Sequence, residues 1–180
     1  MVIPLLVGAG ISVALGTYGR AHDPTGRSLY TLFFSDTLRL KAWLSTGVLA
    51  LAVTQPITGR WLSRSRQAPA RRPGPAARPA PVWLGDLHRL IGTTAFALSL
   101  PVAYHCLWAL GYQNPSARVA VHSLVGCAFY GAFAAKIITV RRSESPAWAV
   151  PLMGALTLSF VVVVWWTGAL WYFDNVTWSP

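Results

Sequence analysis

Residues 90–140, LIGTTAFALSLPVAYHCLWALGYQNPSARVAVHSLVGCAFYGAFAAKIITV, decide the fold of this chain. Two apolar runs, Leu90–Leu110 and Val119–Val140, flank a short polar turn at Gly111–Ala117. Each run has about twenty residues, and a helix of that length, at about 1.5 Å per residue, crosses a hydrocarbon core of about 30 Å. The stretch therefore predicts a membrane hairpin, with the rest of the chain packed around it.

The composition of the chain also indicates a membrane protein. Its 180 residues are 54% hydrophobic and 11% charged, whereas soluble domains carry about 25% charged residues. A net charge of +10 would indicate nucleic-acid binding in a soluble protein. Here the arginines lie between apolar runs, where they report topology instead, so we expect membrane lipid and no nucleic acid as a partner. The two cysteines lie inside apolar runs, which argues against a disulfide framework.

Three further apolar runs complete the predicted architecture. Together with the hairpin they predict an all-α integral membrane bundle of five transmembrane helices in a single domain, residues 1–180, with spans at about 2–18, 40–57, 90–110, 119–140 and 147–171. The first run is expected to be a retained helix, because no basic residue precedes it and no A-x-A cleavage pattern follows. Small residues at Gly8, Ser12 and Gly16 form a stripe that suits close helix packing in lipid. Small residues scattered through an alanine-rich chain explain this pattern equally well.

The basic residues predict the orientation of the bundle. The arginine- and proline-rich segment Arg60–Pro81 cannot bury apolar surface and is expected to be a mobile cytoplasmic loop. With five spans, ten of the fifteen basic residues fall on the side of this loop and five on the other. The positive-inside rule then places the N-terminus in the cytoplasm and the C-terminus outside, in a bacterial plasma membrane.

Two histidines inside the hairpin are the main candidates for chemistry. His105 lies five residues before the end of the third span, and His122 lies four residues after Arg118, where the fourth span begins. Both then lie roughly 6–8 Å below the outer interface, on adjacent helices. Two imidazoles at matched depth can hold the iron of haem b as its axial ligands. A quinone or proton site, or a purely structural hydrogen bond to another helix, remain the alternatives.

A third histidine, His88, is the candidate for a second site. It precedes His105 by 17 residues, about 25 Å along a helix, so the two cannot share one metal. A haem bound by His88 would need its own second ligand, for which Met153 is the nearest thioether. The alternative is a solvated helix start, in which Asp86, His88 and Arg89 face water. With one haem near the outer face, the chain alone has no evident electron path across the membrane.

Three stretches carry a resemblance to a known family. They are HRLIGTTAFALSLPVAYHCLWALG at 88–111, RVAVHSLVGCAFYGAFAAKI at 118–137 and FSDTLRLKAWL at 34–44. They resemble an uncharacterised family of actinobacterial multi-spanning membrane proteins, a domain of unknown function. More loosely, histidines on adjacent helices resemble the cytochrome b561 and ferric-reductase type of membrane haem protein. That resemblance implies paired histidines for two haems, whereas this chain has a pair for one.

The leading functional hypothesis is therefore a b-type haem protein, or cytochrome-like subunit, in electron transfer near the outer face. If it takes part in an enzyme, it is an oxidoreductase subunit that exchanges electrons with a quinol or a redox protein partner. The alternative is a non-enzymatic membrane subunit or scaffold without a cofactor, inside a larger membrane complex. A small transporter is a third hypothesis, against which the chain shows no internal repeat.

Overall fold

The computed structural model describes residues 2–27, 30–71 and 81–176. Over these residues the chain is helical and contains no strand, which confirms the all-α class. The elements in order are α1 (Val2–Ala21), α2 (Thr37–Arg71), α3 (Val82–His105), η1 (Cys106–Leu110), α4 (Ala117–Arg141), α5 (Ala149–Trp165), η2 (Trp166–Leu170) and α6 (Trp171–Asn175). The two η elements are π-helical turns that continue α3 and α5 without a break. Such turns are rare and occur frequently at functional sites.

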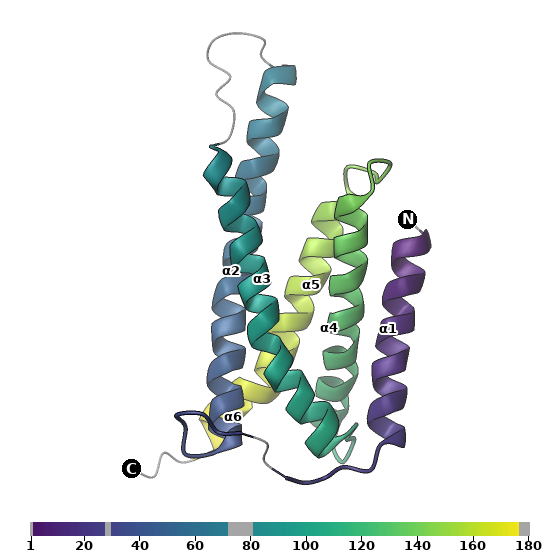
Figure 1. Ribbon diagram of the computed structural model, residues 1–180, viewed down its shortest axis with the longest axis vertical. Coiled ribbons are helices and arrows are strands. Elements are labelled where there is room, and N and C mark those ends of the chain that lie inside the picture. Colours follow the sequence, from purple (N-terminus) through teal and green to yellow (C-terminus); the bar gives the residue numbers. More distant parts are fainter. Residues whose placement is uncertain (1, 28–29, 72–80, 177–180) are drawn as a thin grey trace.

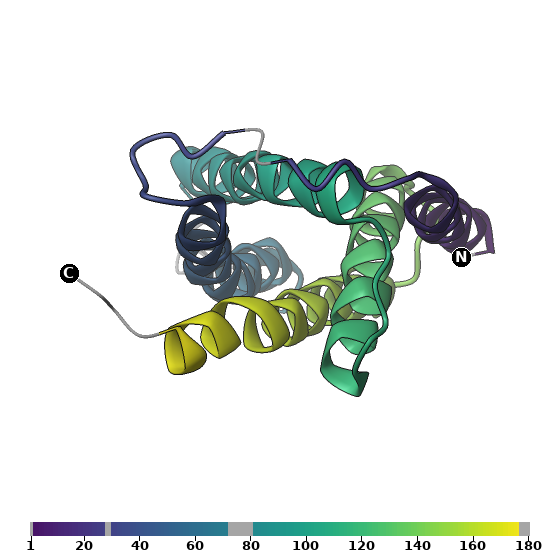
Figure 2. The ribbon, with the colours of Figure 1, turned by 90° about the horizontal axis from the view of Figure 1, so that it is seen from below.

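The long helices run up and down, with α2, α3, α4 and α5 around a common centre and α1 outside against α4 (Figures 1 and 2). We call the end that holds the turn 111–116 the hairpin end, and the end towards which α2 extends to Arg71 the arginine end. The N-terminus lies towards the arginine end and the C-terminal helix α6 at the hairpin end (Figure 1).

Polar side chains cap two of these helices at the hairpin end. The Asp36 carboxylate accepts a hydrogen bond from the backbone N–H of Arg39 at 2.8 Å, at the start of α2. The Ser116 hydroxyl accepts one from the N–H of Val119 at 3.3 Å, at the start of α4. Both satisfy backbone donors that the first turn of a helix leaves free.

Four helical segments of the described chain are long and apolar enough to cross a membrane, namely Val2–Ala21, Val82–Leu110, Ala117–Arg141 and Ala149–Asn175. A third or less of the most apolar window of each one is buried inside the protein. The remaining apolar side chains face outward, as lipid contact requires. The fifth expected span, residues 40–57, lies on α2, which carries Lys41 and Gln55 within that range and is not among the four.

Helix α2 differs from its prediction beyond residue 57. The segment from Arg60 was expected to be a loop, whereas the structure continues the helix to Arg71. Arginine, glutamine and alanine are good helix formers, so an established helix can continue through them. It ends just before the closely spaced prolines at 73, 75, 79 and 81, where helix formation becomes costly. Residues 72–80 of the predicted mobile loop lie outside the described residues.

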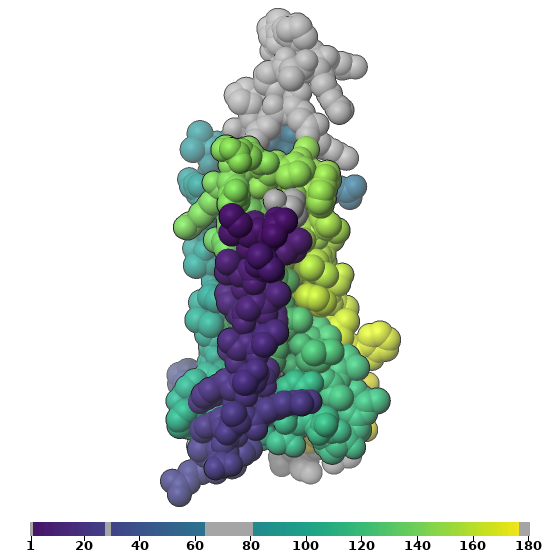
Figure 3. All heavy atoms as spheres, turned by 90° about the vertical axis from the view of Figure 1, so that its right-hand side faces the viewer, coloured from purple at the N-terminus to yellow at the C-terminus, as the bar shows by residue number. Residues whose placement is uncertain are grey.

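Helix α1 packs on α4 through small residues, and Figure 3 shows it lying lengthwise along one face of the molecule. A Cβ on Gly8 would lie 2.6 Å from the carbonyl oxygen of Gly131, and a Cβ on Gly131 would overlap the backbone of Gly8. The Ser12 hydroxyl donates to the carbonyl of Gly8 at 3.0 Å. Glycine at both positions therefore allows the two backbones to meet. Gly16 has no such neighbour within 4 Å, so only part of the predicted stripe makes this contact.

The two helices of the predicted hairpin, α3 and α4, make little direct backbone contact. Aromatic side chains bridge them instead, because Phe96 stacks on Phe133 with ring centroids 4.4 Å apart. The Tyr130 hydroxyl on α4 donates to Ser99 on α3 at 3.0 Å. Towards the hairpin end, the space between the two helices belongs to a cavity.

Candidate ligand cavity

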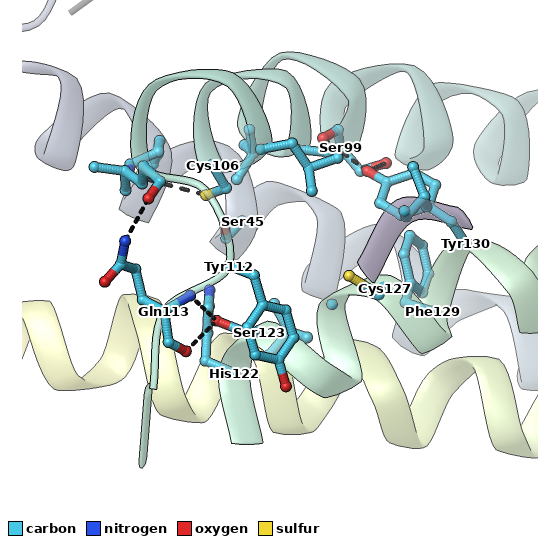
Figure 4. Close-up of a pocket in the computed structure, with 18 of the residues that line it drawn as sticks. Ser45, Ser99, Cys106, Tyr112, Gln113, His122, Ser123, Cys127, Phe129 and Tyr130 are labelled. Carbon is cyan, nitrogen blue, oxygen red and sulfur yellow. Dashed lines mark hydrogen bonds between the residues drawn. The ribbon is translucent and has the colours of Figure 1, made fainter. Parts of the chain in front are cut away.

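A cavity of about 230 Å³ lies inside the bundle at the hairpin end. Helices α2 to α5 and the turn after η1 surround it, and Leu15 of α1 also reaches it. Figure 4 shows labelled residues from several of these elements around the same space. Its wall is mostly apolar, with a few polar groups that include Lys41, Ser45, Cys106, Tyr112, His122 and Ser123. An apolar concavity with a few convergent polar groups is typical of a small-molecule site.

His122 lines this cavity from α4 and is held there by a hydrogen bond. Its Nδ1 lies 3.0 Å from the hydroxyl oxygen of Thr167 on η2. The carbonyl of Val163 lies 2.7 Å from the same hydroxyl, and when the hydroxyl donates there, Nδ1 of His122 supplies the hydrogen of the first bond. A neutral imidazole that donates from Nδ1 keeps its lone pair on Nε2. A histidine oriented in this way is the usual form of a metal ligand.

A glycine makes room for this ring. A Cβ on Gly168 would lie 2.7 Å from Cε1 of His122 and 3.7 Å from Nε2. Gly168 lies in the π-helical turn η2, next to Thr167. The turn thus supplies both the hydrogen-bond partner of His122 and the space beside it.

His105, the other predicted axial ligand, does not line the cavity. It precedes the cavity residue Cys106 by one position, which turns its side chain by about 100° around the helix. Its side chain is only 5% exposed, and its Nδ1 has no hydrogen-bond partner in the described part of the chain. Both histidines lie at the hairpin end, and the charge of Lys41 acts on both. The structure brings His122, and not His105, to the cavity wall.

His88 lies on the first turns of α3, close to the arginine end. Its Nδ1 lies 2.7 Å from the hydroxyl oxygen of Thr58 on α2. The side-chain amide of Gln55 donates to the backbone carbonyl of His88 at 3.1 Å. These bonds join α2 to α3 and use the ring nitrogen that faces α2. Met153, the second ligand suggested for His88, is buried on α5.

The fourth histidine, His22, holds the first connection against the bundle. Its Nε2 lies 3.2 Å from the carbonyl oxygen of Trp108, and its ring stacks on that indole with centroids 4.5 Å apart. Among the described residues, no group of three or more His, Cys, Asp and Glu side chains could hold a metal ion.

Tyr30 ties the same connection to α3 by donating to the carbonyl of Pro101. Burial raises the pKa of Tyr30, and the charges of Cys106 and Tyr104 in their ionised forms raise it further. The phenol is therefore neutral at ordinary pH and able to keep donating this hydrogen bond.

Lys41 is the cavity residue that the sequence analysis missed. It was counted only among the basic residues that set topology, although it lies just inside an expected span. The chain has two lysines, Lys41 and Lys136, and only Lys41 lines the cavity. A lysine that begins an apolar run was the signal available in the sequence.

Apolar helices that run antiparallel around a cavity and expose apolar faces define a polytopic helical membrane protein. The chain belongs to the family of unknown function DUF6529, whose model matches residues 1–180. No curated protein and no solved structure matches the chain. The expectation of a family of unknown function is thereby confirmed, whereas its actinobacterial origin stays a prediction.

Proposed function

We propose that this protein is an integral membrane haem b protein that takes part in electron transfer at its hairpin end. The observation that carries the proposal is His122, which lines the cavity with its Nδ1 held 3.0 Å from the Thr167 hydroxyl oxygen. A hydrogen bond to the second ring nitrogen orients a metal-binding histidine and raises its basicity. Bound haem would supply one-electron chemistry, and the apolar wall would exclude water from it.

His105 enters this proposal as the residue that would supply a second ligand to the iron. Its buried Nδ1 has no partner within the described residues, which is costly for a polar atom. The π-helical turn η1 begins at the next residue, Cys106. Coordination by His105 would require this turn to rewind by about one residue, which is about 100° of rotation. Without that change, His122 would act with a different group, or alone, on the iron.

The proposal includes a topology. Helix α2 serves as a fifth span beside the four apolar ones, which places the N-terminus and the arginine end in the cytoplasm of a bacterial cell. The cavity then lies in the outer half of the membrane, where it can exchange electrons with a quinol or a redox protein partner. Reporter fusions at the two termini test this orientation, because five crossings put them on opposite sides.

The haem proposal is tested on the protein purified in detergent from haem-replete cells. A reduced-minus-oxidised absorption spectrum and a pyridine haemochrome assay should give a b-type signal near one haem per chain. His122→Ala should remove this signal, and His88→Ala is the matched control that should keep it. His105→Ala distinguishes a site with two histidine ligands from a site in which His122 is the one histidine ligand. Loss of haem in this variant would indicate two histidine ligands. A colourless wild-type protein would end the proposal.

A second function is supported by the hydrogen bonds of the histidines themselves. His22, His88 and His122 each bind a group on a neighbouring segment, as histidines that only hold helices together also do. The protein would then be a cofactor-free membrane subunit or scaffold. A colourless protein that co-purifies with a stoichiometric membrane partner would support this function over haem binding.

A further inference from the structure

Lys41 brings a positive charge to the cavity that no acidic side chain of the protein neutralises. The chain has five acidic residues, and all five lie in the described part of the structure. The ion pair recorded there joins Arg89 to Asp86 on α3, near the arginine end. The contact recorded for the Lys41 ammonium is the Cys106 sulfur at 3.9 Å, which is a weak acceptor.

Lys41 is half-buried on a mostly apolar wall, and ionisable groups at such places in membrane proteins usually pair with another group. Arg118, at the start of α4, lies near the same end, but its guanidinium is held by the carbonyl of Thr167 and lies over the Trp171 ring at 4.0 Å. Lys41 is therefore a cation on the cavity wall with which no acidic side chain pairs in the described structure.

We propose that the cavity binds an amphiphile with a carboxylate, which pairs with the Lys41 ammonium while its apolar body lies against the cavity wall. A carboxylate supplies both the negative charge and the strong hydrogen-bond acceptors that Lys41 lacks. Two ligands share this chemistry, namely the propionates of haem and the carboxylate of a free fatty acid. The inference shares its cavity with the haem proposal, but it does not depend on iron ligation by His122.

Matched probe pairs test the inference on the full-length protein in detergent. The first pair is cis-parinaric acid and its methyl ester, followed by probe fluorescence. The second pair is haemin and haemin dimethyl ester, followed by absorption. In at least one pair the wild type should bind the free acid tenfold or more tightly than the ester. The pair that shows this preference identifies the source of the carboxylate.

Three variants assign the preference to one side chain. Lys41→Gln should reduce the ratio of ester to acid dissociation constants to about one, and Lys41→Arg should restore most of it. Lys136→Gln is the matched control, because it removes the other lysine of the chain from a position outside the cavity, and it should leave the ratio unchanged. Equal binding of acid and ester by the wild type, no binding of any probe, or a ratio that survives in Lys41→Gln would overturn the inference. If the protein is colourless but still prefers parinaric acid through Lys41, the haem proposal is ruled out and the inference of a carboxylate ligand stands.

Discussion

The two ends of the bundle hold similar polar residues in different states. At the arginine end, His88 and Gln55 form hydrogen bonds between α2 and α3. At the hairpin end, His122 and Lys41 face a cavity, and Lys41 has no counter-ion among the acidic residues. The cavity described above lies at the hairpin end. Polar groups in a membrane protein indicate a ligand when the protein itself leaves them unsatisfied.

The comparison indicates different roles for His88 and His122. The bond between His88 and Thr58 joins α2 to α3 away from the cavity, whereas the bond between His122 and Thr167 holds a ring that lines the cavity. The first arrangement stabilises the fold, and the second suits coordination. Variants at the two ends should therefore separate stability from ligand binding.

The largest effect is expected from replacing the histidines themselves. His122→Ala should reduce haem content from about one per chain to the background of the assay, because it removes the proposed iron ligand. His88→Ala should keep the haem content and instead lower the temperature at which the protein unfolds in detergent. The pyridine haemochrome assay and a thermal aggregation curve, recorded on the same preparations, check both. Equal haem loss in the two variants would show that the two ends of the bundle do not differ in haem binding.

The next effect is expected at Thr167, the residue that orients His122. Thr167→Val should weaken haem binding by about 10- to 100-fold, the usual cost of removing a hydrogen bond to a metal-binding histidine. Thr157→Val is the matched control, because Thr157 lies on the same helix and its hydroxyl donates to the carbonyl of Met153. Haemin titration of protein freed of haem measures the two affinities. Comparable affinities would mean that Thr167 does not orient an iron ligand.

A glycine beside the ring gives a steric version of the same test. Gly168→Ala places a methyl group 2.7 Å from Cε1 of His122, so the ring or the turn η2 must shift. We expect a loss of haem affinity of about tenfold, comparable with the loss from a disturbed orienting bond, together with a shifted absorption band. Gly154→Ala should change neither quantity, because a Cβ there has nothing within 4 Å. An unchanged spectrum in Gly168→Ala would show that the added methyl group does not disturb the His122 ring.

Hydropathy and length predicted the helices well, because a spanning helix needs only a run of apolar residues. The end of the bundle at which His105 and His122 lie was also accessible, since position along a helix depends on residue count alone. The direction of each ring was not, because helices that are apolar on all sides give no signal of which face meets a neighbour. Consecutive helices were assumed to face each other, whereas α3 and α4 separate around the cavity. His105 therefore lies at the expected end of the bundle but off the cavity wall.

The extension of α2 and the role of Lys41 escaped the sequence analysis for a shared reason. Both concern basic residues next to an apolar run, which were assigned to topology. A count of basic residues on each side of a membrane does not distinguish a loop arginine from one on a helix that continues to Arg71. Nor does it distinguish a lysine at the interface from one that lines a cavity.

The smallest effect is expected at the arginine end, from the partner of His88. Thr58→Val removes the hydroxyl that lies 2.7 Å from Nδ1 of this histidine and leaves the ring without its bond to α2. Side-chain hydrogen bonds between membrane helices contribute about 0.6 kcal/mol on average and about 1.7 kcal/mol at most. Thr58→Val should therefore lower the free energy of unfolding by about 1 kcal/mol, measured by denaturation in mixed micelles, and leave haem content unchanged.

Thr54→Val, one turn earlier on α2, is the control, because its hydroxyl donates only within its own helix, to the carbonyl of Leu51 at 2.7 Å. A loss of haem in Thr58→Val at unchanged stability would place a binding site at the arginine end as well, and His88 would then be a ligand rather than a joint between helices.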